Sequence, residues 1–118
     1  MAKATVVSVR PLGRAALPTV DAVVARDRPA EPLVCLRPAA IAGAARRFVG
    51  AFSGDVLYAV KCNPEPRVLR AVAAGRVTHF DCASLPEVAL VREVLPQAEI
   101  HFMHPVKARA AIAAAYDR

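Results

Sequence analysis

The sequence has few cysteines that could cross-link the chain through disulfides or bind a metal through sulfur. It contains 118 residues, no tryptophan and only three cysteines, Cys35, Cys62 and Cys82. The cysteines form no CxxC pair, and no histidine pair at ligand spacing accompanies them. Such spacing argues against a disulfide framework and against a zinc site. We therefore expect reduced thiols, a cytoplasmic protein and no bound metal.

The sequence also lacks long apolar runs and nucleotide-binding motifs. No stretch approaches the roughly 20 consecutive apolar residues that a membrane-spanning helix needs. The first residues contain no continuous apolar segment of the kind found in secretory signals. Neither GxGxxG nor GxxxxGK[ST] occurs, so both common nucleotide-binding fingerprints are missing. We expect no association with membranes.

Acidic residues are scarce, with 10 Asp and Glu against 16 Lys and Arg, a formal net charge of +6. The basic residues are scattered, and only Arg46 and Arg47 are adjacent. A surface that binds nucleic acid more often shows a stripe of basic residues with interleaved aromatic residues. Aromatic residues make up only 5% of this chain. The sequence therefore predicts no nucleic-acid partner.

What the sequence does contain is a high share of hydrophobic residues, 56%, in a repeating arrangement. Short apolar runs, which predict buried strands, alternate with segments of helical spacing. The strands are predicted over residues 33–36, 56–60, 77–81 and 99–103. The helices that follow them are predicted over residues 39–52, 67–74, 84–95 and 106–116.

Four successive β-α units with short connections predict an α/β domain over residues 33–118. Its strands should be parallel, with helices outside them, in a doubly wound sheet or a (β/α) barrel. Residues 1–32 form a separate amino-terminal segment, with a short strand over 5–9 and a helix over 20–26 that begins after Thr19. In both architectures the carboxyl ends of the strands carry the chemistry.

Ionisable residues stand at the carboxyl ends of three of the predicted strands, namely Lys61, Asp81 and His104. Ala59 should share a face with Lys61, because side chains alternate along a strand, and its small side chain leaves room beside the lysine. A lysine in this place is either an ordinary solvated charge or a desolvated nucleophile suited to Schiff-base chemistry. Position alone leaves both interpretations open.

Ser84-Leu85-Pro86-Glu87 has the pattern of a helix capping box. The serine would be the N-cap, and the glutamate would stand at the third helical position. The same two residues lie just beyond the end of a predicted strand, close to Asp81. Capping explains them without any chemistry, and a role in a site at the strand ends is an equally good explanation.

The three strand ends resemble the motifs of a known family. Tyr58-Ala59-Val60-Lys61-Cys62-Asn63-Pro64 resembles the cofactor-lysine motif of the ornithine/diaminopimelate/arginine decarboxylase family. Phe80-Asp81-Cys82-Ala83-Ser84, followed by Glu87, resembles that family's next strand-end motif. Phe102-Met103-His104-Pro105-Val106-Lys107 resembles the one after it. The resemblance runs from about residue 18 to 118, and the first two motifs favour the ornithine decarboxylase branch.

The resemblance implies a cofactor, pyridoxal 5'-phosphate, and roles for the residues of these motifs. Lys61 would be the catalytic residue that holds the cofactor through a Schiff base, with Ala59 lining the cofactor's floor. Asp81 would be a cofactor-binding carboxylate that favours a protonated nitrogen close by. Ser84, Glu87 and His104 would be neighbours of the site. His104 replaces the familiar asparagine, and we favour a role in ending the strand.

Three further residues lie in or next to these motifs without a role in the site. We expect Cys62 to point to the face opposite Lys61 and to pack against the protein. His79 shares a face with Asp81, and His101 lies inside the fourth strand, and we assign neither of them a catalytic role.

The family's fold is an alanine-racemase-like, TIM-type (β/α)8 barrel, and this chain would hold its first half, about four β/α units. The implied reaction is decarboxylation of a small amino acid, most simply ornithine to putrescine in polyamine biosynthesis. Lysine, arginine or diaminopimelate are alternative substrates. The complete enzyme is expected to be a homodimer. The family's phosphate site lies in later strands, so we expect an amino-terminal fragment that is inactive alone. The alternative is a non-catalytic decarboxylase-like binding protein or a truncated remnant.

Overall fold

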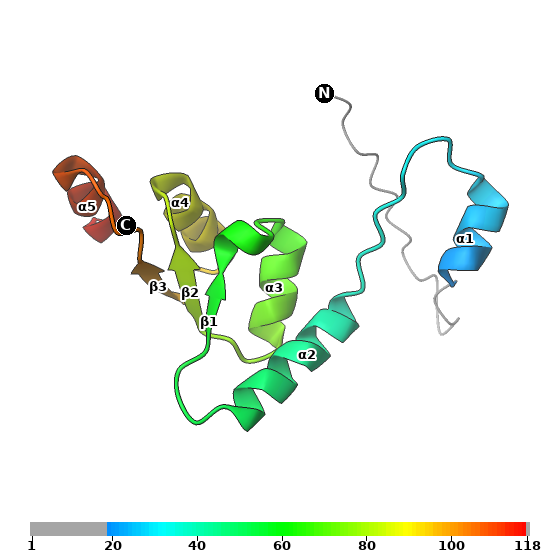
Figure 1. The fold of residues 1–118 in the computed structure, drawn as a ribbon, viewed down its shortest axis with the longest axis horizontal. Coiled ribbons are helices and arrows are strands. Elements are labelled where there is room, and N and C mark those ends of the chain that lie inside the picture. Colours follow the sequence, from blue (N-terminus) through cyan, green and yellow to red (C-terminus); the bar gives the residue numbers. More distant parts are fainter. Residues whose placement is uncertain (1–18, 118) are drawn as a thin grey trace. The chain divides into compact units, whose positions relative to one another are not determined.

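A computed structural model describes residues 19–117 of the chain (Figure 1). The chain divides into two compact units, Met1–Leu36 and Arg37–Arg118, which we describe separately. In the first unit, helix α1 spans Val20–Asp27, as the sequence predicts. Its N-cap is Thr19, whose Oγ1 accepts a hydrogen bond of 3.1 Å from the backbone N–H of Ala22. The strand predicted over residues 5–9 lies outside the described residues.

The prediction of a buried strand over residues 33–36 is wrong. These residues have no regular secondary structure, the Val34 side chain is 69% exposed, and Cys35 is exposed as well. A short apolar run becomes a strand only where a neighbouring strand supplies hydrogen bonds to its backbone. Within residues 19–117, the sheet consists of three other strands, and none of them pairs with this segment.

The second unit is a mixed α/β structure around a parallel sheet with the strand order β1-β2-β3. The predicted parallel strands and alternating helices are confirmed, with ends that shift by a few residues. Its elements are α2 (Pro38–Ala51), β1 (Leu57–Ala59), the 3₁₀ turn η1 (Val60–Cys62), α3 (Pro66–Ala74), β2 (His79–Cys82), α4 (Leu85–Val94), β3 (Glu99–Phe102) and α5 (Arg109–Tyr116).

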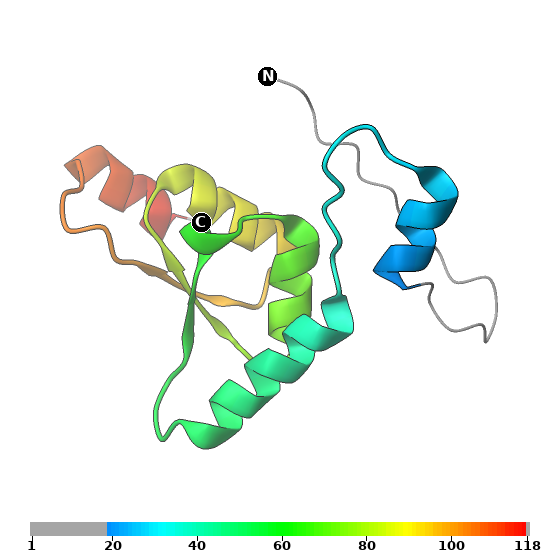
Figure 2. The ribbon, with the colours of Figure 1, turned by 45° about the vertical axis from the view of Figure 1, so that its right-hand side comes forward.

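The two faces of the sheet have different environments, and β2 shows the difference most clearly. Phe80 and Cys82 are completely buried, whereas His79 and Asp81, which alternate with them, are only partly buried. Helices α3 and α4 cover the face of Phe80 and Cys82 (Figure 2). The buried side chains that these helices contribute are Val68, Leu69, Ala71, Val72, Val88 and Val91.

The opposite face of the sheet carries polar side chains, and no described helix of this unit covers it. Its side chains are accessible, and the sheet holds them in fixed positions because its other face packs against the core.

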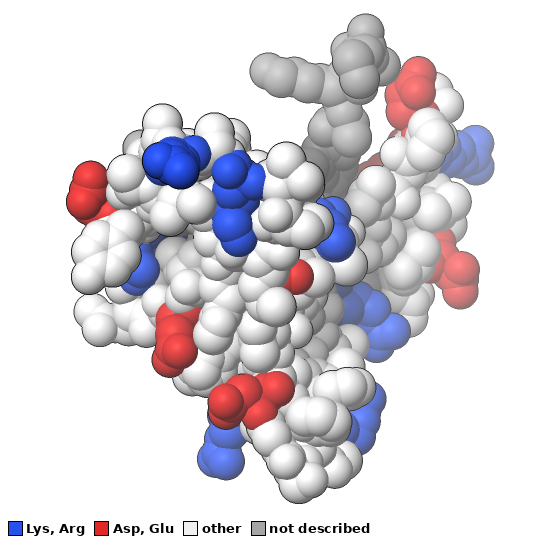
Figure 3. Space-filling model, turned by 60° about the vertical axis from the view of Figure 1, so that its left-hand side comes forward, with Lys and Arg blue, Asp and Glu red and all other residues white. Residues whose placement is uncertain are grey.

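Charged side chains are interspersed over the surface. In the view of Figure 3, lysine and arginine stand in separate groups among uncharged residues, with acidic groups between them. They form no continuous stripe on this face. No described helix combines the length and the apolar character required to cross a membrane.

Gly75 ends α3 at the point where α2 passes closest to it. A Cβ atom at this position would lie 2.3 Å from the Ala45 Cβ and 2.7 Å from the carbonyl oxygen of Ala42, both in α2. The glycine itself has a φ of −85°, and the left-handed conformation falls on Arg76, with a φ of 73°. The sequence correctly places the helix end at Gly75, but the requirement for glycine comes from the neighbouring helix.

We predict that Gly75→Ala lowers the free energy of unfolding by about 1–3 kcal/mol, because α2 must move away from the added methyl group. Gly50→Ala is the matched control, since a Cβ at Gly50 meets nothing within 4 Å. In that variant the stability should stay the same or rise slightly. Urea denaturation of both variants tests this, and equal stabilities for the two would contradict the close approach of α2.

Candidate active site

The register of the sheet brings residues from three strands into one row on its polar face. Ala59 of β1 pairs with Asp81 of β2, and Asp81 pairs with His101 of β3. This row lies toward the carboxyl ends of the strands, where parallel α/β folds place their active sites. The predicted neighbours Ala59 and Asp81 are therefore adjacent across β1 and β2.

Lys61 lies immediately beyond this row, but not in a strand. The sequence predicts a strand through Val60, with Lys61 on the face of Ala59 and Leu57. Instead β1 ends at Ala59, and Val60–Cys62 form the 3₁₀ turn η1, so the alternation of faces does not extend to the lysine. The turn takes the Val60 side chain into the core, where it is completely buried. Lys61 is left exposed on an element that contacts β2.

The segment after Lys61 is fixed by its own hydrogen bonds. The Tyr58 hydroxyl donates to the carbonyl oxygen of Asn63 at 3.3 Å, and the Asn63 side-chain oxygen accepts from the backbone N–H of Glu65 at 3.1 Å. The Tyr58 ring also packs edge-to-face against Phe80, with 6.1 Å between ring centres. The loop that carries Lys61 is thus tied to the core through Tyr58.

The prediction that Cys62 packs against the protein is wrong. Because the backbone turns at η1, Cys62 is exposed. The buried thiol is that of Cys82, which sits in the helix-covered layer next to Phe80. Burial raises the pKa of the Cys82 thiol to about 12, and the nearby charges of Glu87 and Asp81 act in the same direction. Cys82 is therefore an unreactive core residue despite its place beside Asp81.

Ser84 and Glu87 form a slightly shifted capping box at the start of α4. The Ser84 Oγ accepts a hydrogen bond of 3.4 Å from the backbone N–H of Glu87. The Glu87 carboxylate accepts one of 2.8 Å from the backbone N–H of Ala83, one residue before the N-cap. Both side chains are partly buried. These hydrogen bonds give both residues a structural role, which satisfies two N–H groups at the helix start.

His104 and Lys107 close the loop that follows β3. The His104 Nδ1 lies 3.1 Å from the backbone N of Val106 and 2.6 Å from its carbonyl oxygen, and the ring's tautomer decides which of the two bonds it makes. The Lys107 ammonium donates to the carbonyl oxygen of Phe102 at 2.8 Å and lies 5.2 Å from the centre of the Phe102 ring. His104 is exposed and ends the strand by this turn, the role that the sequence favours for it.

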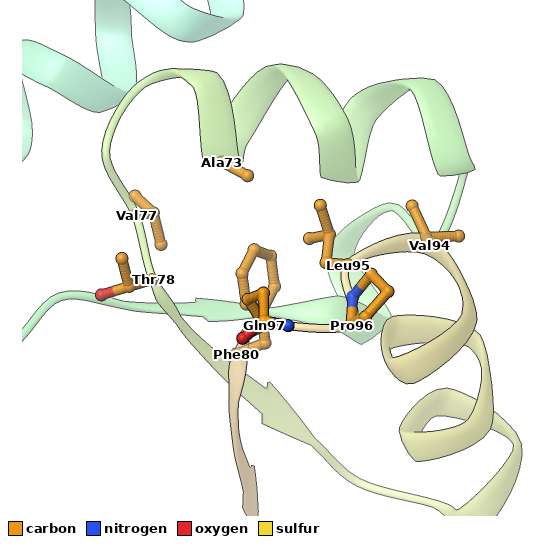
Figure 4. Close-up of a pocket in the computed structure, with 9 residues that line it drawn as sticks. Ala73, Val77, Thr78, Phe80, Val94, Leu95, Pro96 and Gln97 are labelled. Atoms are coloured by element: carbon orange, nitrogen blue, oxygen red, sulfur yellow. The ribbon is translucent and has the colours of Figure 1, made fainter.

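Two apolar cavities lie on the helix-covered side of the sheet, away from the row of Ala59 and Asp81. One of about 320 Å³ is lined by residues of α3, β2 and the turn after α4 (Figure 4). The other, of about 420 Å³, lies between α2 and β1. In Figure 4 the Phe80 ring points from β2 into the first cavity, among Ala73 and Leu95. Neither cavity is lined by a residue that the sequence predicts for the site.

Two histidines on the polar face make contacts that the sequence analysis did not foresee. The His79 Nδ1 lies 3.0 Å from the His101 Nε2, and Glu99 approaches both rings. The alternation of side chains along the strand places His79 on the same face as Asp81, and this part of the contact can be read from the sequence. The pairing with His101 depends on the register of β2 and β3, which the sequence alone does not give.

We predict that Glu87→Gln preserves stability, because glutamine can accept the same hydrogen bond from Ala83. Glu87→Ala should lower the free energy of unfolding by about 1 kcal/mol through loss of the cap. Urea denaturation measures both. Cofactor retention is the second readout: if Glu87→Gln folds normally but loses the cofactor, the carboxylate has a role in the site that capping does not explain.

Comparison with known proteins gives one match. A family model described as the pyridoxal binding domain of pyridoxal-dependent decarboxylases matches residues 39–118. No curated protein and no solved structure matches the chain. The matched segment contains all three strands of the sheet and every residue of the row at their carboxyl ends. The chain therefore belongs to the pyridoxal-dependent decarboxylase family, through the domain that binds the pyridoxal phosphate cofactor.

Proposed function

We propose that the protein is a pyridoxal-phosphate-dependent carboxy-lyase acting on ornithine, and that Lys61 anchors its cofactor. The observation that carries the proposal is the register of β1 and β2, which sets Ala59 beside Asp81 and Lys61 two residues beyond Ala59. A partly buried carboxylate and a small side chain thus lie side by side at the carboxyl ends of two parallel strands, and an exposed primary amine follows on the next turn.

These residues fit the cofactor chemically. The Lys61 amine is exposed and is suited to hold an aldehyde carbon covalently. The cofactor, when bound, supplies a conjugated ring that accepts the electron pair left when carbon dioxide departs. The Asp81 carboxylate would favour a protonated nitrogen nearby through its negative charge. Ala59 leaves space beside Asp81, because its side chain is a single methyl group.

The other residues around this edge of the sheet form hydrogen bonds to backbone groups. Ser84 and Glu87 hold the start of α4, and His104 holds the turn after β3. We infer that they keep the strand ends in position and do not touch the reacting atoms.

The finer parts of the proposal rest on the motifs. Tyr58-Ala59-Val60-Lys61-Cys62-Asn63 and Phe80-Asp81-Cys82-Ala83-Ser84 favour ornithine as substrate and putrescine as product, in polyamine biosynthesis. Lysine, arginine and diaminopimelate are the alternative substrates. The parallel β-α units support a complete (β/α)8 barrel, of which this chain supplies the early strands. A homodimer located in the cytoplasm belongs to the same proposal. The competing function is a non-catalytic relative that binds a partner.

We predict that sodium borohydride, added with pyridoxal phosphate, fixes the cofactor predominantly on Lys61. The chain offers an internal control, because its other lysines are Lys3 and Lys107. The Lys107 amine is already engaged by the Phe102 carbonyl and ring, so it should react slowly. Peptide mapping by mass spectrometry gives the distribution. Labelling spread evenly over the three lysines would rule out a prepared cofactor site.

We predict that Lys61→Ala in the complete protein lowers the decarboxylation rate at least about 1000-fold, which corresponds to about 4 kcal/mol in activation free energy. Lys61→Arg should fail equally, because it keeps the charge but has no amine suited to hold the cofactor. Lys107→Ala is the control and should keep its activity. Release of carbon dioxide from ornithine, lysine, arginine and diaminopimelate is the measurement.

The outcomes of this assay separate the two functions. Turnover near the wild-type rate in Lys61→Ala would refute the assignment of the lysine. Specific labelling of Lys61 without turnover of any of the four amino acids would favour the non-catalytic relative. Turnover of one of the other three amino acids, but not of ornithine, would keep the enzyme and change its substrate.

A further inference from the structure

The polar face of the sheet holds a second cluster of chemically active side chains, set apart from Lys61. It consists of His79, the first residue of β2, together with Glu99 and His101 of β3. The two residues His79 and Glu99 pair directly across the strands, at the level of Leu57 in β1. His79 and Glu99 thus lie toward the amino ends of the strands, and His101 joins them from the row that holds Ala59 and Asp81.

Three potential ligand atoms of this cluster form a compact triangle. The His79 Nδ1 and the His101 Nε2 are 3.0 Å apart, and the Glu99 Oε1 lies 3.6 Å from each of these nitrogens. A tetrahedral zinc ion with bonds of about 2.0–2.1 Å requires its ligand atoms to be about 3.3–3.4 Å apart. The three separations bracket this value, so small movements of the side chains would complete the coordination.

The two rings lie within hydrogen-bond distance of each other, whereas the carboxylate makes no hydrogen bond to either of them. At 3.6 Å the Glu99 Oε1 is too far from either ring nitrogen for a hydrogen bond, yet it is equally distant from both. Its side chain is 64% exposed and has room to adjust. An oxygen at equal distances from two nitrogens is placed to share a cation with them.

The burial of the cluster also suits a metal that keeps a water ligand. The side chains of His79 and His101 are 19% and 32% exposed, so their rings are held in place by the sheet. The exposed side of the triangle, next to Glu99, leaves a fourth position open to solvent. Near the other ring nitrogen of His79, at 3.9 Å, lies the Asp55 carboxylate. This separation exceeds a hydrogen bond, and a small movement of the exposed Asp55 side chain would bring it to the place of the outer partner that orients a metal-bound histidine.

We propose that His79, His101 and Glu99 bind a zinc ion, with Asp55 as the outer partner of His79. Two imidazoles and one carboxylate are a donor set that zinc favours over magnesium or calcium. The ion would join β2 to β3 through His79 and His101, and His101 pairs with Asp81. We assign the ion a structural role, which requires no part in the pyridoxal chemistry.

Isothermal titration with zinc chloride tests the proposal on protein stripped with EDTA and freed of excess cofactor. We expect one zinc ion to bind per chain and to raise the midpoint of thermal unfolding, with no such effect from magnesium chloride. His79→Asn and His101→Gln should each weaken zinc binding at least about 100-fold. Asp55→Asn should weaken it about tenfold, as outer-partner substitutions do. Unfolding in EDTA shows whether each variant is folded.

The chain provides matched controls. His104→Gln removes the third histidine, and Cys62→Ser removes an exposed thiol, and both should leave zinc affinity unchanged. Should a histidine variant fail to fold, Glu99→Gln at the exposed rim replaces it, with an expected loss of at least about tenfold. Cobalt substitution gives a spectroscopic readout, with visible bands of a tetrahedral site of nitrogen and oxygen ligands.

Several results would overturn the zinc site. These are the absence of zinc binding, wild-type affinity in both histidine variants or in a folded Glu99→Gln, and a thiolate-to-cobalt charge-transfer band that disappears in Cys62→Ser. None of these results depends on decarboxylase activity, so the zinc site and the proposed function are tested independently.

Discussion

The placement of β2 between β1 and β3 is the constraint on which the rest of the structure depends. The pairing of β2 with both neighbours fixes which residues of the three strands stand in one row. The alternation of side chains along β2 decides which face of the sheet each of its residues occupies. Phe80 and Cys82 enter the helix-covered core, so Asp81 and His79 must face the other way. A slip of one residue would put the Asp81 carboxylate under the helices and expose Phe80, both at a considerable cost in free energy. The position of Asp81 on the polar face is therefore a consequence of the burial of its neighbours.

Local signals in the sequence predict the helices well, because caps and helical spacing act over a few residues. Ser84 and Glu87 mark the start of α4, and Thr19 marks the start of α1. The strands are harder to predict, because an apolar run needs a partner that may lie far away along the chain. Residues 33–36 have the composition of a strand but no described partner, whereas the equally short Leu57–Ala59 is held by β2. The same reasoning applies to Gly75, whose need for glycine comes from Ala42 and Ala45.

In the candidate site, too, local features could be predicted from the sequence, and features that depend on distant contacts could not. Its residue types and their order along the chain identify the family, and the register of β1 and β2 then brings Ala59 and Asp81 together. The exposure of Cys62 escaped prediction, and that of Lys61 was left open, because both depend on Val60 turning into the core and ending the strand one residue early. The histidine cluster escaped it for another reason. Rules for metal sites look for ligands a few residues apart, but His79 and His101 are separated by a helix and two turns and meet only across paired strands.

The two ends of the polar face impose different physical demands. At the carboxyl ends, the proposed cofactor anchor Lys61 stands on a short exposed turn, where its amine is accessible. His79, Glu99 and His101, in contrast, belong to the strands themselves and are held by the backbone ladder, with His101 paired to Asp81. His79 and Asp81 are two residues apart on one strand, about 7 Å along it. A cation joining β2 to β3 would thus fix the strand that carries Asp81 without reaching the lysine. The sheet can thus hold the histidine cluster rigidly within its strands while the turn that carries Lys61 stays accessible.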